Sequence, residues 1–251
     1  IARFLEGYPN LPIINPPIKV LATTRGENYR RLSKLPHVRF PRTFHFTNSG
    51  KPVEALARLD AEGLGYPMIL REAGTQTGHT MGLFETPQAA ETYLVDVPAG
   101  TNMYGISYVD CRDNDGYYHK IRCFFIDRCF YPVACLTNDV WQIHSGDRYR
   151  VMAQSQATQE KERFYLSDPV AFLGEKAYAA LGEVARIIDL DFFGIDFALD
   201  DKGGIVVFEA NAAMRHNFDH AAAFPYTEPH LRRITGAMQK MVADKIASAS
   251  V

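Results

Sequence analysis

The feature of this sequence that most constrains its fold is the stretch FFGIDFALDDKGGIVVFEAN at residues 192–211. Two apolar runs lie on either side of a short turn at residues 200–203, whose residue types favour a tight reversal of the chain. Within each run, large apolar residues alternate with small, acidic or amide residues, which is the two-residue period of a β-strand. The stretch therefore predicts an antiparallel hairpin, with Val207 and Glu209 on one face of its second strand.

The predicted register brings three oxygen-bearing side chains together on this hairpin. Pairing Leu199 with Gly204 sets Asp196 one diagonal step from Glu209, a backbone separation of roughly 7–8 Å, and Asn211 follows on the same strand. Two carboxylates and an amide are ligands that a hard cation accepts. We therefore predict a cation site on this face. The simpler alternative is a hairpin whose acidic face is only solvated.

A second motif is the glycine- and threonine-rich loop GTQTGHTMG at residues 74–82, which separates two predicted strands. Its glycines expose backbone N–H groups, Thr75 and Thr77 add hydroxyl donors, and Arg71 offers a charged fork at the end of the preceding strand. The loop has no GxxxxGK[ST] pattern and does not lead directly into a helix, so neither a P-loop nor a dinucleotide fingerprint fits. Taken alone, the loop is equally consistent with phosphate binding and with an ordinary mobile hairpin.

Basic residues in two further segments are candidates for binding an anion. Lys120 and Arg122 share a face of a predicted strand with Phe124, and cations on an otherwise apolar strand are costly unless an anion meets them. This favours a functional role over a salt-bridged surface. Arg25 opens a basic segment at residues 25–34, for which phosphate contact and a solvated face are evenly balanced.

The remaining segments predict a mixture of helices, strands and loops. Prolines 9, 12, 16 and 17 predict an extended lead-in over residues 1–20. Residues 37–46 are predicted to form one strand, and residues 154–161 a mobile polar segment. A long helix is predicted after Asp168, and a closing helix over residues 228–247.

Composition fits a chain with a substantial core and gives no sign of a nucleic-acid or membrane partner. The 251 residues are 47% hydrophobic and 22% charged, which suits one large domain or two smaller lobes. The net charge of −2 provides no broad basic surface for nucleic acid. No apolar run reaches the roughly 18 residues of a membrane span, and the four cysteines do not suggest a disulfide framework. We therefore expect a cytoplasmic protein.

Because residue 1 is isoleucine, we also expect that a preceding N-terminal domain is missing.

The order of these motifs resembles the ATP-grasp superfamily, nearest to the glutathione synthetase and RimK-like carboxylate–amine ligases. The resemblance rests on YPMILRE with its Gly/Thr loop, the strand meander with Arg122, and FGIDFAL followed by FEAN. It implies an α+β fold in which two lobes with antiparallel sheets clamp a nucleotide. Residues 1–40 would form a lead-in and link to an N-terminal domain, residues 41–103 the small lobe with the glycine-rich loop, and residues 104–251 the large lobe with the metal site.

The resemblance also implies an activity and roles for individual residues. The activity would be ATP- and Mg²⁺-dependent ligation of a small-molecule or peptide carboxylate to an amine through an acylphosphate. Asp196, Glu209 and Asn211 would bind Mg²⁺. The implied catalytic residues are Arg122 and Lys120 at the γ-phosphate and Arg215 on the acceptor side. The implied nucleotide contacts are Arg25, Arg71, Gly74, Thr75, Thr77, Gly78, Tyr108, Val109 and Asp110. The family usually has lysine at the positions of Arg71 and Arg25.

Two other classes of function stay open from the sequence. The chain could be a noncatalytic or partial nucleotide-binding module of a larger protein. Alternatively, His216 and His220 with Asp219 could form a transition-metal site on a helix, which would indicate a metal-dependent hydrolase. The sequence does not decide whether the chain forms a homodimer.

Overall fold

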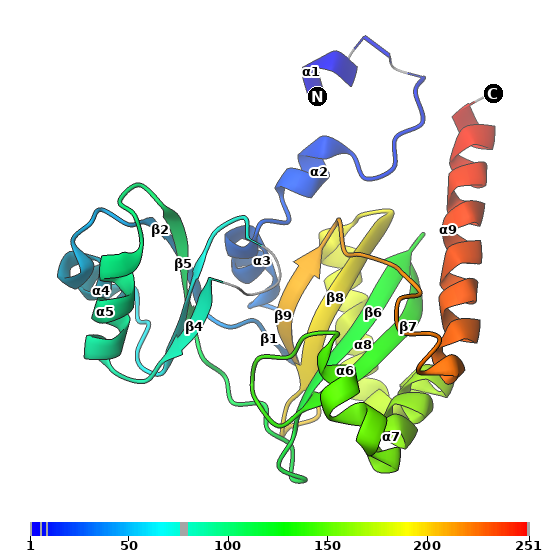
Figure 1. The fold of residues 1–251 in the computed structure, drawn as a ribbon. Coiled ribbons are helices and arrows are strands. Elements are labelled where there is room, and N and C mark those ends of the chain that lie inside the picture. Colours follow the sequence, from blue (N-terminus) through cyan, green and yellow to red (C-terminus); the bar gives the residue numbers. More distant parts are fainter. Residues whose placement is uncertain (1, 6, 9, 76–79, 250–251) are drawn as a thin grey trace. The chain divides into compact units, whose positions relative to one another are not determined.

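The computed structural model describes residues 1–251 except 1, 6, 9, 76–79 and 250–251. The chain separates into two compact units (Figure 1). The smaller unit covers Phe40–Asp110, and the larger unit combines Ile1–Arg39 with Cys111–Val251. Among the described helices, none is long and apolar enough to cross a membrane.

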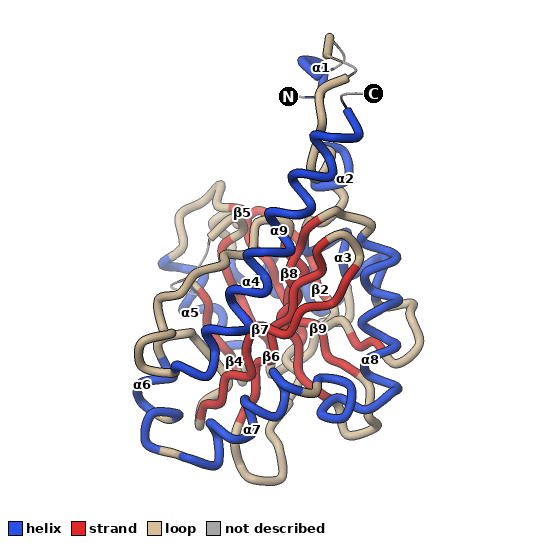
Figure 2. Tube along the Cα trace, turned by 90° about the vertical axis from the view of Figure 1, so that its right-hand side faces the viewer, coloured by secondary structure: helices blue, strands red, loops and turns tan. Residues whose placement is uncertain are grey.

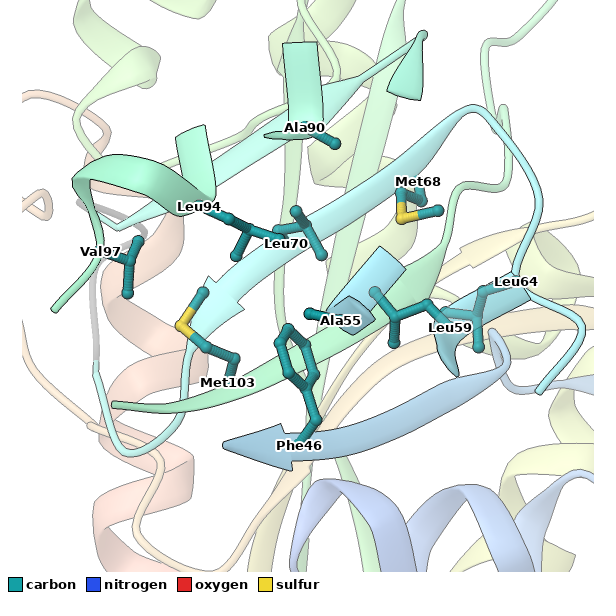
Figure 3. Packing of buried hydrophobic residues seen from close by; sticks show 10 residues of the cluster. All are labelled: Phe46, Ala55, Leu59, Leu64, Met68, Leu70, Ala90, Leu94, Val97 and Met103. Carbon is teal, nitrogen blue, oxygen red and sulfur yellow. The ribbon is translucent and has the colours of Figure 1, made fainter. Parts of the chain in front are cut away.

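The smaller unit consists of one antiparallel sheet covered on one face by two helices. The strand order is β2 (Thr43–Thr47), β5 (Asn102–Ser107), β3 (Met68–Glu72) and β4 (Met81–Phe84). The helices are α4 (Pro52–Ala61) and α5 (Pro87–Asp96). Figure 3 shows the core between the layers, which contains Phe46, Ala55, Leu59, Leu64, Met68, Leu70, Ala90, Leu94, Val97 and Met103.

Local sequence signals explain how these helices start and how closely they approach the sheet. The Thr86 hydroxyl accepts a hydrogen bond from the Ala89 backbone N–H at 3.3 Å and caps α5, whose first residue is a proline. A Cβ added at Gly105 of β5 would lie 2.8 Å from Leu59 Cδ2. The missing side chain at Gly105 therefore gives α4 the space to pack directly on the strand.

A five-stranded sheet forms the centre of the larger unit. The strand order is β1 (Val38–Arg39), β9 (Ile205–Asn211), β8 (Phe192–Leu199), β6 (Tyr118–Ile126) and β7 (Cys129–Asn138). β1 runs parallel to β9, and all other neighbours are antiparallel. The helices are α1 (Ala2–Leu5), α2 (Pro17–Leu21), α3 (Arg25–Leu32), α6 (Asp147–Arg150), α7 (Gln156–Ser167), α8 (Pro169–Ile188) and α9 (Glu228–Ala249), with 3-10 turns at Met152–Gln154 and Pro225–Thr227.

The two long helices pack on opposite faces of this sheet. The Phe125 ring contacts Phe130, which in turn contacts Tyr178 of α8 with ring centroids 5.2 Å apart. The next residue back along β6, Phe124, packs instead with Ile234 and Met241 of α9. Because successive strand residues face opposite sides, α8 covers one face and α9 part of the other. The C-terminal end of α9 extends beyond the strands in both views (Figures 1 and 2).

Three local predictions were wrong, each for an identifiable reason. The proline-rich start contains α1, which ends before the first of these prolines, and α2, in which Pro17 occupies the first helical position, where its missing N–H costs nothing. The predicted strand at residues 37–46 is divided into β1 and β2, which belong to different units. The predicted mobile segment at residues 154–161 lies largely in α7, which is capped by Ser155 and buries Tyr165 and Leu166.

Gly194 of β8 is expected to tolerate no side chain. A Cβ there would lie 2.8 Å from Met214 Cβ and 2.9 Å from Phe124 Cδ1. We expect Gly194→Ala to lower the free energy of unfolding by about 1–3 kcal/mol through overpacking. Gly182→Ala is the matched control, since it lies inside α8 with no atom within 4 Å of the added Cβ, and it should stabilise by about 0.5–1 kcal/mol. Urea denaturation measures both, and a neutral Gly194→Ala would contradict this packing.

Candidate functional site

The β8–β9 hairpin places Asp196 directly opposite Glu209. The predicted register, in which the two residues were diagonal neighbours, was therefore wrong. Leu199 pairs with Ile205 rather than with Gly204. Directly opposed residues have Cβ atoms roughly 4.5–5.5 Å apart, so the two carboxylates lie closer together than the sequence predicted.

The turn of this hairpin explains the change in register. Asp200 accepts hydrogen bonds from the backbone N–H groups of Lys202 at 2.9 Å and Gly204 at 2.6 Å. Gly203 has a φ of +74°, which glycine adopts without strain. Together these residues form a longer turn than the one predicted, and the second strand starts at Ile205.

A β-bulge next to the acidic residues also changes which side chains share a face. Phe197 pairs with Val207, whereas the preceding residue Asp196 pairs with Glu209, so Phe208 is the extra residue. Paired residues point to the same face, and neighbouring residues along β8 point to opposite faces. Val207 and Glu209 therefore face opposite sides of the sheet, contrary to the prediction that they share one.

The bulge aligns charged residues across three neighbouring strands. Arg122 of β6 lies opposite Asp196 of β8, which lies opposite Glu209 of β9. Arg122 donates two hydrogen bonds to Asp196, from Nε to Oδ1 at 2.6 Å and from Nη2 to Oδ2 at 2.7 Å. Asn211 follows two residues after Glu209 and donates from Nδ2 to its Oε1 at 3.2 Å. The structure thus brings the three predicted metal ligands and Arg122 together on one sheet.

Neighbouring cations keep the buried carboxylate of this row charged. Burial would raise the pKa of the Asp196 carboxyl, but the charges of Arg122, Lys120 and Arg25 together hold that pKa below its usual value. Lys120 lies two residues before Arg122, and its Nζ donates to the Ile143 carbonyl. Burial lowers the pKa of Lys120 in spite of the nearby Asp196. The face therefore combines fixed negative charge with several cations.

The oxygens of this face suit a hard divalent cation. Asp196 and Glu209 supply carboxylates, and Asn211 supplies an amide oxygen. Asn211 Oδ1 accepts one hydrogen bond from the Ala213 backbone N–H at 2.8 Å, and a carbonyl oxygen has two lone pairs. An all-oxygen set of this kind matches the preference of Mg²⁺ rather than that of a soft transition metal.

The N-terminal end of α3 supports the outer edge of β9. Arg25 Nη1 donates to the Phe208 carbonyl at 2.5 Å, and Asn28 Nδ2 donates to the Ala210 carbonyl at 3.0 Å. These bonds satisfy carbonyls of β9 beyond the part that pairs with β1. Arg25, a predicted nucleotide contact, lies beside the acidic strand. Asn28 was not predicted from the sequence, because one asparagine in a basic segment forms no motif.

In the smaller unit, Arg71 lies at the base of the glycine-rich loop. Its Nη2 donates to the Thr75 carbonyl at 2.5 Å, and the Thr75 and Thr80 hydroxyls are 3.0 Å apart. Tyr93 of α5 donates from its hydroxyl to the Thr80 carbonyl at 2.8 Å. Gly74 precedes this closure with a φ of +78°. The predicted contacts Thr77 and Gly78 lie outside the described residues.

The sheet face of the smaller unit that points away from α4 and α5 combines apolar side chains with the Arg71 guanidinium. Register places Ile106, Ile69 and Leu83 in one row across β5, β3 and β4. The neighbouring row contains Tyr104 and Arg71. This face therefore carries the buried Ile106, the half-buried Ile69 and Leu83 and the Arg71 guanidinium, which lies next to the loop.

The predicted contacts Tyr108, Val109 and Asp110 follow β5 directly. The Tyr108 backbone N–H donates to the Pro67 carbonyl at 3.3 Å. Asp110 is the last residue of the smaller unit, and Cys111 belongs to the larger one. These three residues therefore immediately precede the boundary between the units, and their contact with a nucleotide stays a prediction.

The residues of the hydrolase alternative do not form a metal site. Residues 214–218 are irregular rather than helical. His216 Nε2 lies 3.0 Å from the Thr235 hydroxyl, His220 Nδ1 lies 3.1 Å from the Tyr149 hydroxyl, and Asp219 forms an ion pair with Arg215 at 2.9 Å. Each side chain therefore has a different partner, and Arg215 has its own acidic neighbour.

In the described part of the chain, one other cluster has metal-ligand chemistry, namely Asp113, Asp115 and His119. Lys161 Nζ lies 2.7 Å from Asp113 Oδ2 and 2.8 Å from His119 Nε2. An ammonium group therefore already supplies the positive charge within this cluster. The cluster thus links the loop before β6, and the start of β6 itself, to Lys161 of α7.

The sequence analysis also missed a buried ion pair in the larger unit. Glu162 has no exposed side-chain surface and forms two hydrogen bonds with Arg148, at 2.5 and 2.6 Å. The Tyr226 hydroxyl and the Cys135 backbone N–H also donate to its carboxylate, at 2.8 and 2.9 Å. The pair links α6, α7, β7 and the segment before α9. Arg148 is thus a structural residue rather than a free cation for a substrate.

No family model matches the sequence, and no curated protein matches it. Among solved structures, the chain is similar to a RiPP-associated ATP-grasp ligase from Chryseobacterium gregarium in complex with ADP and a leader and core peptide. The TM-score is 0.54 at 14% identity, covering 97% of this chain and 66% of that one. This chain has the ATP-grasp fold. The predicted α+β ATP-grasp architecture with antiparallel sheets is confirmed.

Two further structures give the extent of this similarity. D-alanine–D-alanine ligase from Bacillus anthracis aligns with a TM-score of 0.56 at 12% identity, over 97% of this chain and 76% of that one. The ATP-grasp ligase PsnB aligns with a TM-score of 0.49 at 17% identity, over 87% of this chain and 61% of that one. This chain thus aligns with about three fifths of PsnB and three quarters of the D-alanine–D-alanine ligase.

Proposed function

We propose that this ATP-grasp chain is an ATP- and Mg²⁺-dependent ligase that joins a carboxylate to an amine or a related nucleophile. The observation that carries the proposal is the row Arg122–Asp196–Glu209, with Asn211 beside it, on a sheet of this fold. Acidic and amide oxygens next to cationic side chains suit a metal–phosphate complex. The oxygens would bind the metal ion, and the cationic side chains would bind the phosphate oxygens.

Asp196, Glu209 and Asn211 are the residues that would hold Mg²⁺. The fit rests on their all-oxygen donor set and on the low pKa of Asp196, which is charged at neutral pH. When bound, the metal would supply positive charge to the phosphate oxygens of the nucleotide.

The sheet face of the smaller unit that points away from α4 and α5 would bind the base and phosphates of the nucleotide. The row Ile69, Ile106 and Leu83 suits the flat apolar faces of a purine, and Arg71 suits phosphate oxygens because its guanidinium presents a planar fork of donors. The backbone N–H groups of the loop would add further phosphate donors. Tyr108, Val109 and Asp110 would contact the base through the connection between the units.

The reaction would proceed in two displacements. A carboxylate oxygen of the first substrate attacks the γ-phosphorus, the bond to ADP breaks, and an acylphosphate forms. The nitrogen lone pair of the amine then attacks the acyl carbon, inorganic phosphate leaves, and the amine loses a proton to solvent. Arg122 and Lys120 would stabilise the negative charge on the transferred phosphoryl group. No protein nucleophile is needed.

The substrates would be a small-molecule or peptide carboxylate and an amine, as in the glutathione synthetase and RimK-like ligases. The peptide complex of the Chryseobacterium gregarium ligase supports a peptide as one candidate. Arg215 would act on the acceptor side, since it lies in the loop directly after β9. Its exposed ion pair with Asp219 would open at little cost, because such pairs contribute about 0–1 kcal/mol.

Oxygen-isotope transfer tests the reaction type. Carboxylates of amino acids and dipeptides labelled with ¹⁸O are incubated with the protein, ATP, Mg²⁺ and an amine. The proposal predicts one ¹⁸O atom in the released phosphate, because the carboxylate oxygen attacks phosphorus. Release of phosphate with oxygen from water alone would contradict ligation. Nucleotide binding without any ADP formation would favour the alternative of a noncatalytic module.

A further inference from the structure

Both carboxylate oxygens of Asp196 are engaged by Arg122. The guanidinium meets the carboxylate through two hydrogen bonds of 2.6 and 2.7 Å, one to each oxygen. The Asp196 side chain is 6% exposed, whereas the Arg122 side chain is 25% exposed. The pair is therefore a nearly buried fork in which the arginine is the partner with access to solvent.

This arrangement creates a competition between two cations. A metal ion at Asp196 would need the same carboxylate that the guanidinium neutralises. Two cations on one carboxylate repel each other, and the repulsion is stronger where little water is present to screen it. Lys120 would add to the repulsion, because its charge already acts on Asp196. Metal binding without a further anion is therefore opposed while Arg122 stays in place.

We propose that Arg122 is the counter-cation of the metal-free site and that Mg²⁺ replaces it at Asp196. The released guanidinium then turns to the phosphate groups of the nucleotide. The inference rests on the proposed function and adds to it a regulation of the same site. Binding of the metal and binding of the nucleotide are thereby coupled, because the metal releases the Arg122 guanidinium from Asp196 and the guanidinium then binds the phosphates. By linkage, each ligand raises the affinity for the other by the same factor.

A purely structural role for Arg122 predicts the opposite sign. If the arginine only orients Asp196 as a ligand, its removal weakens metal binding, as loss of supporting hydrogen bonds does in other metal sites. If the arginine competes with the metal, its removal strengthens metal binding in the absence of nucleotide. The direction of the change in metal affinity therefore decides between the two roles.

The test uses Mn²⁺ as the metal probe and electron paramagnetic resonance to count free ion, with and without ADP. We expect Arg122→Gln to bind Mn²⁺ at least about ten-fold more tightly than wild type without ADP. The factor by which ADP raises the Mn²⁺ affinity should be smaller in Arg122→Gln than in wild type. Arg186→Gln is the control, since Arg186 pairs with Glu183 on the outer helix α8 and should behave as wild type. Equal or weaker Mn²⁺ binding by Arg122→Gln would overturn the inference.

A measurement on the wild-type protein covers the case in which Arg122→Gln fails to fold. The Nε–H resonance of Arg122 is identified in ¹⁵N-arginine-labelled protein by its loss in Arg122→Lys. The chemical shift of this resonance should change when Mg²⁺ and ADP are added together. It should not change when a low concentration of Mg²⁺ is added without ADP. An Arg122 resonance unchanged by Mg²⁺ with ADP, in protein that binds both, would refute the exchange. If wild type binds no Mn²⁺ even with ADP, the proposed function itself fails.

Discussion

Replacing Glu162 with alanine is expected to lower the free energy of unfolding by about 3–5 kcal/mol. Glu162 has no exposed side-chain surface and accepts hydrogen bonds from Arg148, Tyr226 and the Cys135 backbone. Its removal leaves the Arg148 guanidinium, 5% exposed, without a counter-charge. The loss of such a partner is costly because the remaining charge stays desolvated. Urea denaturation followed by circular dichroism measures the change.

Glu160→Ala provides the matched control for this prediction. Glu160 lies two residues earlier on the same helix and is exposed. The hydrogen bond described for its side chain comes from the Gln156 side chain. Its replacement should change the free energy of unfolding by less than about 0.5 kcal/mol. Similar small losses in both variants would show that the buried network does not stabilise the larger unit.

The second large effect is expected for Glu209→Gln. This change removes one of the two carboxylates of the site while it keeps the side-chain shape, and Glu209 is only half-buried. We expect Mg²⁺-dependent binding of a fluorescent ADP analogue to weaken about 10–100-fold, because a carboxylate of the proposed metal site is lost. Thermal stability should change little.

Two comparisons sharpen the Glu209 prediction. Asp196→Ala is a poorer probe, because it would strand the Arg122 guanidinium and combine a stability loss with a binding loss. Glu183→Gln, on the exposed face of α8, changes the same charge away from the site and should bind the analogue as wild type does. Equal nucleotide affinity in Glu209→Gln and Glu183→Gln would exclude Glu209 as a metal ligand.

The sequence predicted the hairpin of the candidate site but not its register. The alternating pattern of residues 192–211 is sufficient to identify two strands. The bulge at Phe208 depends on how Asp200 closes the turn and on which carbonyls Arg25 and Asn28 reach. The contacts of Arg25 and Asn28 join residues 183 and 182 positions apart, and no local pattern encodes them. The candidate residues Asp196, Glu209 and Asn211 could thus be selected from the sequence, while the direct apposition of Asp196 and Glu209 could not.

Charged side chains explain much of what the sequence analysis missed. Glu162 lies in a polar stretch, QATQEKERF, which suggests a solvated segment. Its burial follows from the fork with Arg148, which lies on another helix. Similarly, His216 and His220 have the spacing of a metal pair only if the segment is a helix, whereas residues 214–218 are irregular. Spacing arguments therefore fail where the secondary structure is wrongly assumed.

The most direct test of the account is to locate bound Mn²⁺ with ADP by paramagnetic broadening of backbone amide resonances. The amides of residues 194–196 in β8 and 209–211 in β9 are expected to broaden first. Resonances around Asp113 and Asp115, the other acidic cluster described, should stay sharp, because the Lys161 ammonium already lies between their carboxylates and would repel a metal ion. Broadening at that cluster instead, or none at Asp196 and Glu209, would contradict the assignment of this face as a metal–nucleotide site.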